Sequence, residues 1–193
     1  EGKGEAEISA YVADSLHALG LDVKRSEVAP GRFNVVGTLK GSGGGRSLLL
    51  NAHMDTVGVE GMTIDPFGGE LHDGRIYGRG AQDMKASAAA MLAAVKAIVD
   101  ARIQLLGDLL LTFVADEEYL SIGTEALVKE FSADAAIVTE PTEMQPCRAH
   151  RGFIWFEVDV FGRAAHGSRF AEGIDANVRM GRFLVELEKL AAE

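Results

Sequence analysis

The chain has 193 residues, of which 47% are hydrophobic and 25% are charged, so it can bury a sizeable core in one large domain or in one domain plus part of another. Its formal net charge of −10 argues against nucleic acid or an anionic membrane as a partner, because both attract basic patches. The most apolar stretch falls short of a membrane span, and the lone Cys147 excludes an internal disulfide and favours a reducing compartment, so we expect a cytoplasmic protein.

Hydrophobic periodicity predicts the first elements of the chain. They are, in order, a helix over residues 5–19 and strands over 23–28, 34–39 and 47–52. Gly20 supplies a stop at the end of the helix. The glycine-rich turn at residues 40–46 lacks the glycine spacing and the following helix of a phosphate loop, so we do not expect nucleotide binding there.

A long polar, glycine-rich stretch follows between His53 and Asp83, and a loop of this length inside a compact domain is usually functional. Beyond it the pattern predicts a helix over 84–101, a strand over 108–115, a helix over 122–131 and a strand over 135–139. The strand at 108–115 is a continuous apolar run, typical of a central strand, and the strand at 135–139 is also predicted to be buried. This alternation of helices and strands indicates the α/β class.

The pattern of apolar and polar residues changes after Pro146. Apolar and polar residues alternate over 152–160, which suits a longer antiparallel strand with one solvent-exposed face. Residues 176–190 predict an amphipathic helix. We therefore place a boundary between a first unit, residues 1–146, and a second unit, residues 147–193. The second unit is too small to form a stable core by itself.

A histidine and several acidic residues follow successive predicted strands. They are His53 and Asp55 after 47–52, Asp83 before the helix at 84–101, Glu117 and Glu118 after 108–115, and Glu140 after 135–139. Each has an ordinary alternative: His53 could cap its strand, Asp83 could cap the next helix, and the others could be exposed loop residues. Because successive strand ends can meet at one edge of an α/β sheet, the joint pattern predicts a hydrolytic zinc site.

Four segments carry this pattern: residues 50–57 (LNAHMDTV), 77–85 (YGRGAQDMK), 116–118 (DEE) and 139–142 (TEPT). In order and spacing they resemble the co-catalytic zinc amidohydrolases and exopeptidases typified by acetylornithine deacetylase, succinyl-diaminopimelate desuccinylase, aminoacylase and glutamate carboxypeptidase. The resemblance implies a zinc-exopeptidase-like α/β fold, with a mixed sheet flanked by helices. It also implies that residues 1–146 are the N-terminal part of the catalytic domain and residues 147–193 the first part of an inserted α+β lid, or dimerisation, domain.

The resemblance implies two zinc ions in each active site. His53, Asp83 and Glu140 would bind one ion, Asp83 would bridge, and Glu118 would bind the second. Cobalt or manganese would suit the same mixture of imidazole and carboxylate. In this family the peptide bond after the bridging Asp is often cis.

The resemblance also implies catalytic roles. Glu117 would be the general base, and Asp55 would orient His53. His166, within residues 162–168 (GRAAHGS), is similar to the lid histidine that reaches the active site, in several members that of the partner subunit, and stabilises an oxyanion. Its ordinary alternative is a surface turn histidine.

The implied substrates are small N-acyl amino acids or short peptides with a free carboxylate, and the implied assembly is a homodimer through the lid. Two alternatives stay open: a related zinc aminopeptidase or dipeptidase, and a catalytically incomplete fragment that acts only in association. Members of the family carry a further zinc-binding His near the C-terminus, and His17, His72 and His150 do not fit that role. Because the chain also begins at Glu1 without a Met, we expect it to be truncated.

Overall fold

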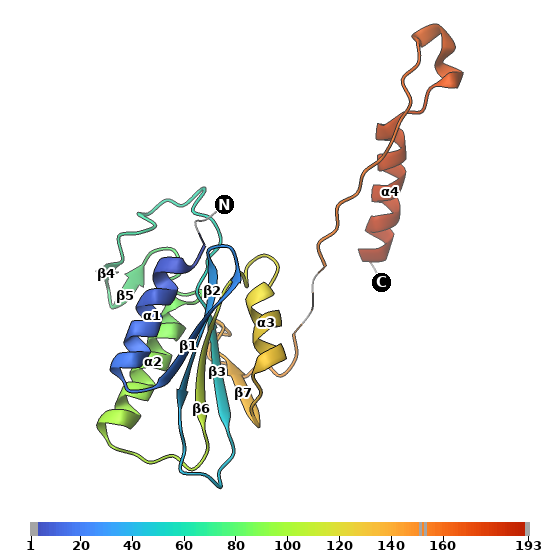
Figure 1. Ribbon diagram of the computed structural model, residues 1–193. Coiled ribbons are helices and arrows are strands. Elements are labelled where there is room, and N and C mark those ends of the chain that lie inside the picture. Colours follow the sequence, from blue (N-terminus) through green and yellow to red (C-terminus); the bar gives the residue numbers. More distant parts are fainter. Residues whose placement is uncertain (1–3, 151, 153, 192–193) are drawn as a thin grey trace. The chain divides into compact units, whose positions relative to one another are not determined.

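Within the described residues, a mixed sheet of five strands forms the centre of the first of two compact units, Glu1–Pro146 and Cys147–Glu193 (Figure 1). The structure, a computed structural model, describes residues 4–150, 152 and 154–191. The strands are, in spatial order, β1 (Asp22–Ala29), β2 (Arg32–Leu39), β6 (Leu109–Val114), β3 (Leu48–His53) and β7 (Ala135–Val138). β1, β2 and β6 pair antiparallel, whereas β6, β3 and β7 run parallel.

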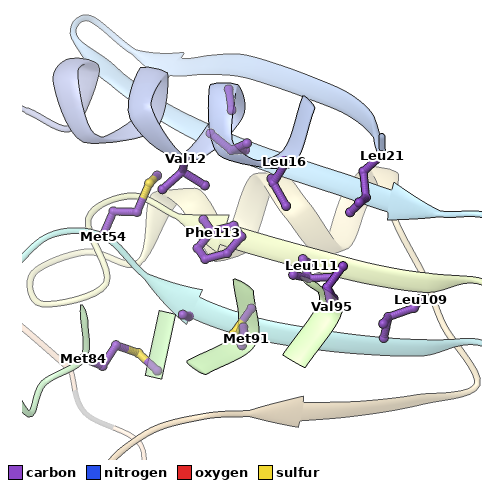
Figure 2. Packing of buried hydrophobic residues seen from close by; sticks show 13 residues of the cluster. Val12, Leu16, Leu21, Met54, Met84, Met91, Val95, Leu109, Leu111 and Phe113 are labelled. Carbon is purple, nitrogen blue, oxygen red and sulfur yellow. The ribbon is translucent and has the colours of Figure 1, made fainter. Parts of the chain in front are cut away.

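Helices flank both faces of this sheet, which confirms the predicted fold class (Figure 1). They are α1 (Ala6–Ala18), α2 (Lys85–Asp100) and α3 (Ile122–Glu130). Figure 2 shows Leu16 of α1 and Val95 of α2 in one cluster with Phe113 of β6. The next residue along β6, Val114, packs instead with Leu127 of α3, because successive side chains of a strand point to opposite faces. All of β6 is buried, as predicted for a central strand.

The parallel strands end at the same edge of the sheet. His53, the last residue of β3, lies in register with Val114, the last residue of β6. Beyond β7, the Thr139 N–H donates to the Asn51 carbonyl at 3.0 Å, which carries the alignment of β7 with β3 one residue further. The residues that follow these strands are therefore brought together at this edge.

Two departures from the expected elements concern β7 and the start of α2. β7 is predicted to be buried, but its residues are exposed, because it lies at the edge of the described sheet and the helices pack chiefly over the other strands. Asp83 does not cap a helix: α2 begins at Lys85, with Met84 at the cap position and no side-chain cap hydrogen bond.

The long stretch after His53 contains a small hairpin that the periodicity did not predict. It is formed by β4 (Glu70–His72) and β5 (Arg75–Tyr77), which pair antiparallel across Asp73 and Gly74. Both turn residues have positive φ, 49° and 73°, as a tight turn between such short strands requires. Strands of three residues are too short to give a periodic signal.

In the second unit, the structure contains the short 3₁₀ helix η1 (Gly167–Glu172) and the helix α4 (Ala176–Ala191), the latter as predicted. The strand predicted over 152–160 is absent at residues 152 and 154–160, and residue 153 lies outside the described part of the chain. A strand needs a neighbouring ladder, and the described residues of this unit offer only the isolated bridge between Arg163 and Ile174. No helix in the described ranges is long and apolar enough to cross a membrane.

Candidate metal centre

Three side chains meet at the carboxyl edge of the sheet. His53 ends β3, Asp83 precedes α2, and Glu140 follows β7, yet their ligand atoms all lie within 4.8 Å of one another. His53 Nε2 is 2.9 Å from Asp83 Oδ1 and 3.6 Å from Glu140 Oε1. One imidazole nitrogen and two carboxylates form a donor set that suits a divalent zinc ion. The peptide bond between Asp83 and Met84 is cis, as the resemblance implied.

The carboxylates of this edge raise one another's affinity for protons. Burial, followed by the charges of Asp83, Glu117 and Glu118, raises the pKa of Glu140 to about 7, although His53 acts in the opposite direction. Burial and the charge of Asp83 likewise raise the pKa of Glu118. Negative charge is therefore concentrated and poorly solvated at this edge, which is the condition that a bound divalent cation would relieve.

His53 is held in a single orientation inside this cluster. Its ring is buried, and burial opposes protonation, but the hydrogen bonds to Asp55 and Asp83 and the charge of Glu140 outweigh that effect and raise its pKa to about 9. Nδ1–H donates to the carbonyl oxygen of Asp55 at 3.0 Å, so Nε2 faces the two carboxylates. A metal ion would take the place of the Nε2 proton.

Asp55 joins two parts of the site. Its Oδ1 lies 3.5 Å from His53 Nδ1, farther than its own carbonyl oxygen, and accepts the Glu117 N–H at 3.1 Å. Its Oδ2 accepts the Glu118 N–H, also at 3.1 Å. Burial works against ionisation of Asp55, yet the hydrogen bonds from His53, Glu118 and Glu117 hold its pKa below the usual range. Asp55 is thus an anion that fixes both the imidazole and the turn after β6.

The turn after β6 brings Glu117 and Glu118 to the same edge. Glu117 Oε2 lies 3.8 Å from His53 Nε2, within reach of the cluster but outside hydrogen-bond distance. The Glu118 N–H donates to Asp55 Oδ2 at 3.1 Å, so Glu118 lies beside the residue that contacts the His53 ring. The six candidate residues of the first unit are therefore gathered in one place.

His166, the remaining candidate, lies in the second unit. Its side chain is exposed and its Nδ1 lies 2.9 Å from Ser168 Oγ, at the start of η1. It also accepts the Ser168 N–H at 3.3 Å. These local contacts describe a turn histidine, and its role at the metal centre stays a prediction.

Several residues that support the site were not singled out from the sequence. The Met84 sulfur accepts the His53 N–H at 3.2 Å, and Lys85 Nζ donates to the Met54 carbonyl at 3.1 Å. Both residues lie in the motif at 77–85, and their position next to Asp83 could have identified them as residues that support the site. Arg32 lines a cavity of about 710 Å³ together with Asp55 and Glu118, and nothing in its sequence surroundings pointed to the site.

Sequence comparisons place the chain among known hydrolases. The profile of peptidase family M20/M25/M40 matches residues 49–183. The chain is 36% identical to an acetylornithine deacetylase from Myxococcus xanthus over 188 residues, 94% of this chain and 48% of that protein. It is 39% identical to an N-formyl-4-amino-5-aminomethyl-2-methylpyrimidine deformylase from Bacillus subtilis (strain 168) over 159 residues, 78% of this chain and 37% of that protein.

Solved structures show the same fold. A tripeptidase from Staphylococcus aureus superposes with a TM-score of 0.70 at 27% identity, over 96% of this chain and 52% of its own. Human carnosine dipeptidase 1 superposes with a TM-score of 0.62 at 23% identity, over 70% of this chain and 32% of its own. The chain thus spans about half, or less, of the length of these relatives.

Proposed function

Because this chain belongs to peptidase family M20/M25/M40, we propose that it carries the metal-binding part of a hydrolase that cleaves the amide bond of a small N-acyl amino acid or a short peptide. The observation that carries the proposal is the convergence of His53, Asp83 and Glu140 within 4.8 Å at one edge of the sheet. An acyl amino acid of the acetylornithine or succinyl-diaminopimelate type is the favoured substrate, since the acetylornithine deacetylase relative aligns over 94% of the chain.

His53, Asp83 and Glu140 would hold one zinc ion, with Asp83 shared and Glu118 reserved for a second. Bound zinc would supply Lewis-acid chemistry, by polarising a carbonyl oxygen and making water more acidic. The mixed imidazole and carboxylate donors would also accept cobalt or manganese. The concentrated negative charge of the cluster supports this assignment, because burial and the neighbouring carboxylates raise the pKa values of Glu140 and Glu118, and a divalent cation would offset that charge.

The protein's own groups would position the substrate and move the proton. Glu117 would take a proton from the attacking water and deliver it to the leaving amine, as a general base and then a general acid. The Asp55 carbonyl would keep the proton on Nδ1 of His53, which leaves Nε2 free as a ligand. His166 would stabilise the oxyanion, and residues 147–193 would form the lid through which the protein dimerises.

A second candidate is a related aminopeptidase or dipeptidase. The tripeptidase structure supports it, since it superposes over 96% of this chain. Such an enzyme requires a free amine on its substrate, whereas a deacetylase acts on an acylated one. Hydrolysis of N-acetylornithine, compared with that of unblocked tripeptides and amino-acid amides, separates these two functions.

Zinc content is the first test of the site. The chain, its His53→Ala variant and a His72→Ala control are each equilibrated with zinc, dialysed and measured by elemental analysis. His72 is an exposed histidine of the β4–β5 hairpin, so its variant controls for adventitious binding to imidazole. We expect the wild-type chain and the control to retain zinc and His53→Ala to lose it. Equal zinc in all three proteins, or none in the wild type, would contradict the proposal.

A further inference from the structure

The turn that carries Glu117 and Glu118 starts from a residue in an unusual conformation. Asp116 is buried and has a φ of 59°, in the left-handed region that side chains other than glycine adopt at a cost. The next two N–H groups, those of Glu117 and Glu118, both donate to the Asp55 carboxylate. Successive N–H groups next to a left-handed residue form a concavity that binds an anion. The conformation of Asp116 therefore decides whether this concavity exists.

Arg32 holds Asp116 through an ion pair. Its Nη1 lies 3.2 Å from Asp116 Oδ1 and 2.6 Å from Glu5 Oε1, so one guanidinium joins the start of β2, the residue before α1 and the acidic turn. Both carboxylates are nearly inaccessible, with side-chain exposures of 4%. Their other oxygens, Glu5 Oε2 and Asp116 Oδ2, have no hydrogen-bond partner among the described residues. A buried carboxylate depends strongly on such a counter-ion.

The base of the same turn is fixed independently of Arg32. The Asn34 side chain accepts the Ala115 N–H at 3.0 Å and donates to the Gly123 carbonyl at 2.7 Å. These two bonds close the ends of the turn, and the Ser121 N–H donates to the Asp116 carbonyl at 2.6 Å, so the backbone that follows Asp116 is also anchored. The ion pair with Arg32 adds the contact that holds the Asp116 side chain, and with it the left-handed conformation of this residue.

We propose that Arg32 is a positioning residue for the metal centre. Through Asp116 it keeps the left-handed turn that directs the N–H groups of Glu117 and Glu118 at Asp55, and so places the candidate base and the candidate second metal ligand. The importance of that placement rests on the proposed function. The conformational effect of Arg32 is independent of the proposed function, because this effect is measured in the metal-free chain.

The test compares Arg32→Gln/Asp116→Gly with Arg32→Gln/Asp116→Ala. Both variants remove the same two charges, but glycine adopts a positive φ freely and alanine does not. Amide hydrogen exchange at Glu117 and Glu118, measured by NMR on the metal-free chain, reports the two bonds to Asp55. We expect both amides to exchange about tenfold faster in the alanine variant than in the glycine variant, from the cost of a left-handed alanine. Arg32→Gln alone should accelerate their exchange relative to the wild type.

Exchange at Leu111 in the central strand is the control for global stability and should not distinguish the glycine and alanine variants. Equal exchange of Glu117 and Glu118 in those two variants, or unchanged exchange in Arg32→Gln, would overturn the inference. If Arg32→Gln prevents folding, Arg32→Lys provides the same comparison, because it keeps the charge but lacks the planar guanidinium whose Nη1 contacts both carboxylates.

Zinc titration of the same proteins separates this inference from the proposed function. If the wild type binds zinc through His53 but the glycine and alanine variants match in exchange and in zinc affinity, the inference alone fails. If Arg32→Gln accelerates the exchange and the glycine and alanine variants differ, but the wild type binds no zinc, the proposed function alone fails, and Arg32 still positions the turn. An exchange difference accompanied by tighter zinc binding in the glycine variant supports both.

Discussion

Asp55 Oδ2 accepts the backbone N–H of Glu118 at 3.1 Å, and this bond ties the segment after β3 to the turn after β6. The Asp55 carbonyl meanwhile holds Nδ1 of His53. One residue therefore fixes the orientation of the central imidazole and the position of the acidic pair. Changes at Asp55 should disturb both parts of the site together.

Asp55→Asn should lower stability and zinc affinity. The amide keeps the size of the side chain, but its NH₂ group faces one of the two N–H donors and leaves that donor unsatisfied, at a cost of about 1–3 kcal/mol. Urea unfolding of the metal-free chain measures this loss. Asp73→Asn, in the exposed β4–β5 turn, is the matched control and should unfold at the wild-type midpoint. An Asp55→Asn midpoint equal to that of the control would mean that these bonds do not stabilise the fold.

The metal-free chain should lose stability as the pH rises. The pKa of His53 is raised from 6.5 to about 9 and that of Glu140 from 4.5 to about 7, so the folded state binds both protons more tightly than the unfolded state. The contribution of Glu140 is complete below pH 4.5 and lost by about pH 7, and that of His53 is complete below pH 6.5 and lost by about pH 9. Thermal unfolding across this range measures both effects.

The His53→Gln variant is the control for this pH dependence. It should remove the fall in stability between about pH 7 and pH 9 that His53 causes. A wild-type melting temperature that stays level or rises over the same interval would show that His53 is not held as a proton donor.

Zinc should stabilise the chain more strongly at higher pH. The ion competes with the proton on His53 Nε2, so its affinity should increase as the pH approaches the pKa of about 9. At zinc concentrations about 100-fold above Kd, the expected stabilisation is about 2.7 kcal/mol. Melting curves with zinc and with EDTA at several pH values measure it. His53→Ala should show no zinc-dependent shift, and a shift equal to that of the wild type would place the ion elsewhere.

Glu117→Gln should separate catalysis from metal binding. The amide cannot accept the proton of the attacking water, so hydrolysis in the protein that carries the activity should fall by about 10²–10⁴-fold while zinc content is retained. Glu118→Gln should instead reduce zinc content, because Glu118 is assigned as a ligand. Glu70→Gln, on the exposed strand β4, is the control for both measurements. Full activity in Glu117→Gln would show that Glu117 is not the general base.

Local pattern was enough to predict the order of the main elements and the residues that follow the parallel strands. Hydrophobic periodicity predicted α1, α2, α3 and the central strand β6, because the apolar residues that an element buries recur at a regular spacing along its sequence. Its motifs identified His53, Asp83 and Glu140, which the structure brings within 4.8 Å. The short strands β4 and β5 were not predicted, because three residues are too few to show a period.

How these residues are held depends on contacts that form when the chain folds. β7 has the apolar sequence of a buried strand, but burial depends on what packs against a strand, and its residues are exposed. The strand predicted over 152–160 likewise depends on a neighbouring ladder. Arg32 and Asp116 are 84 residues apart in sequence and form an ion pair at 3.2 Å. Such contacts between distant residues leave no local pattern, because their partners are chosen by the folded backbone and not by the spacing of the chain.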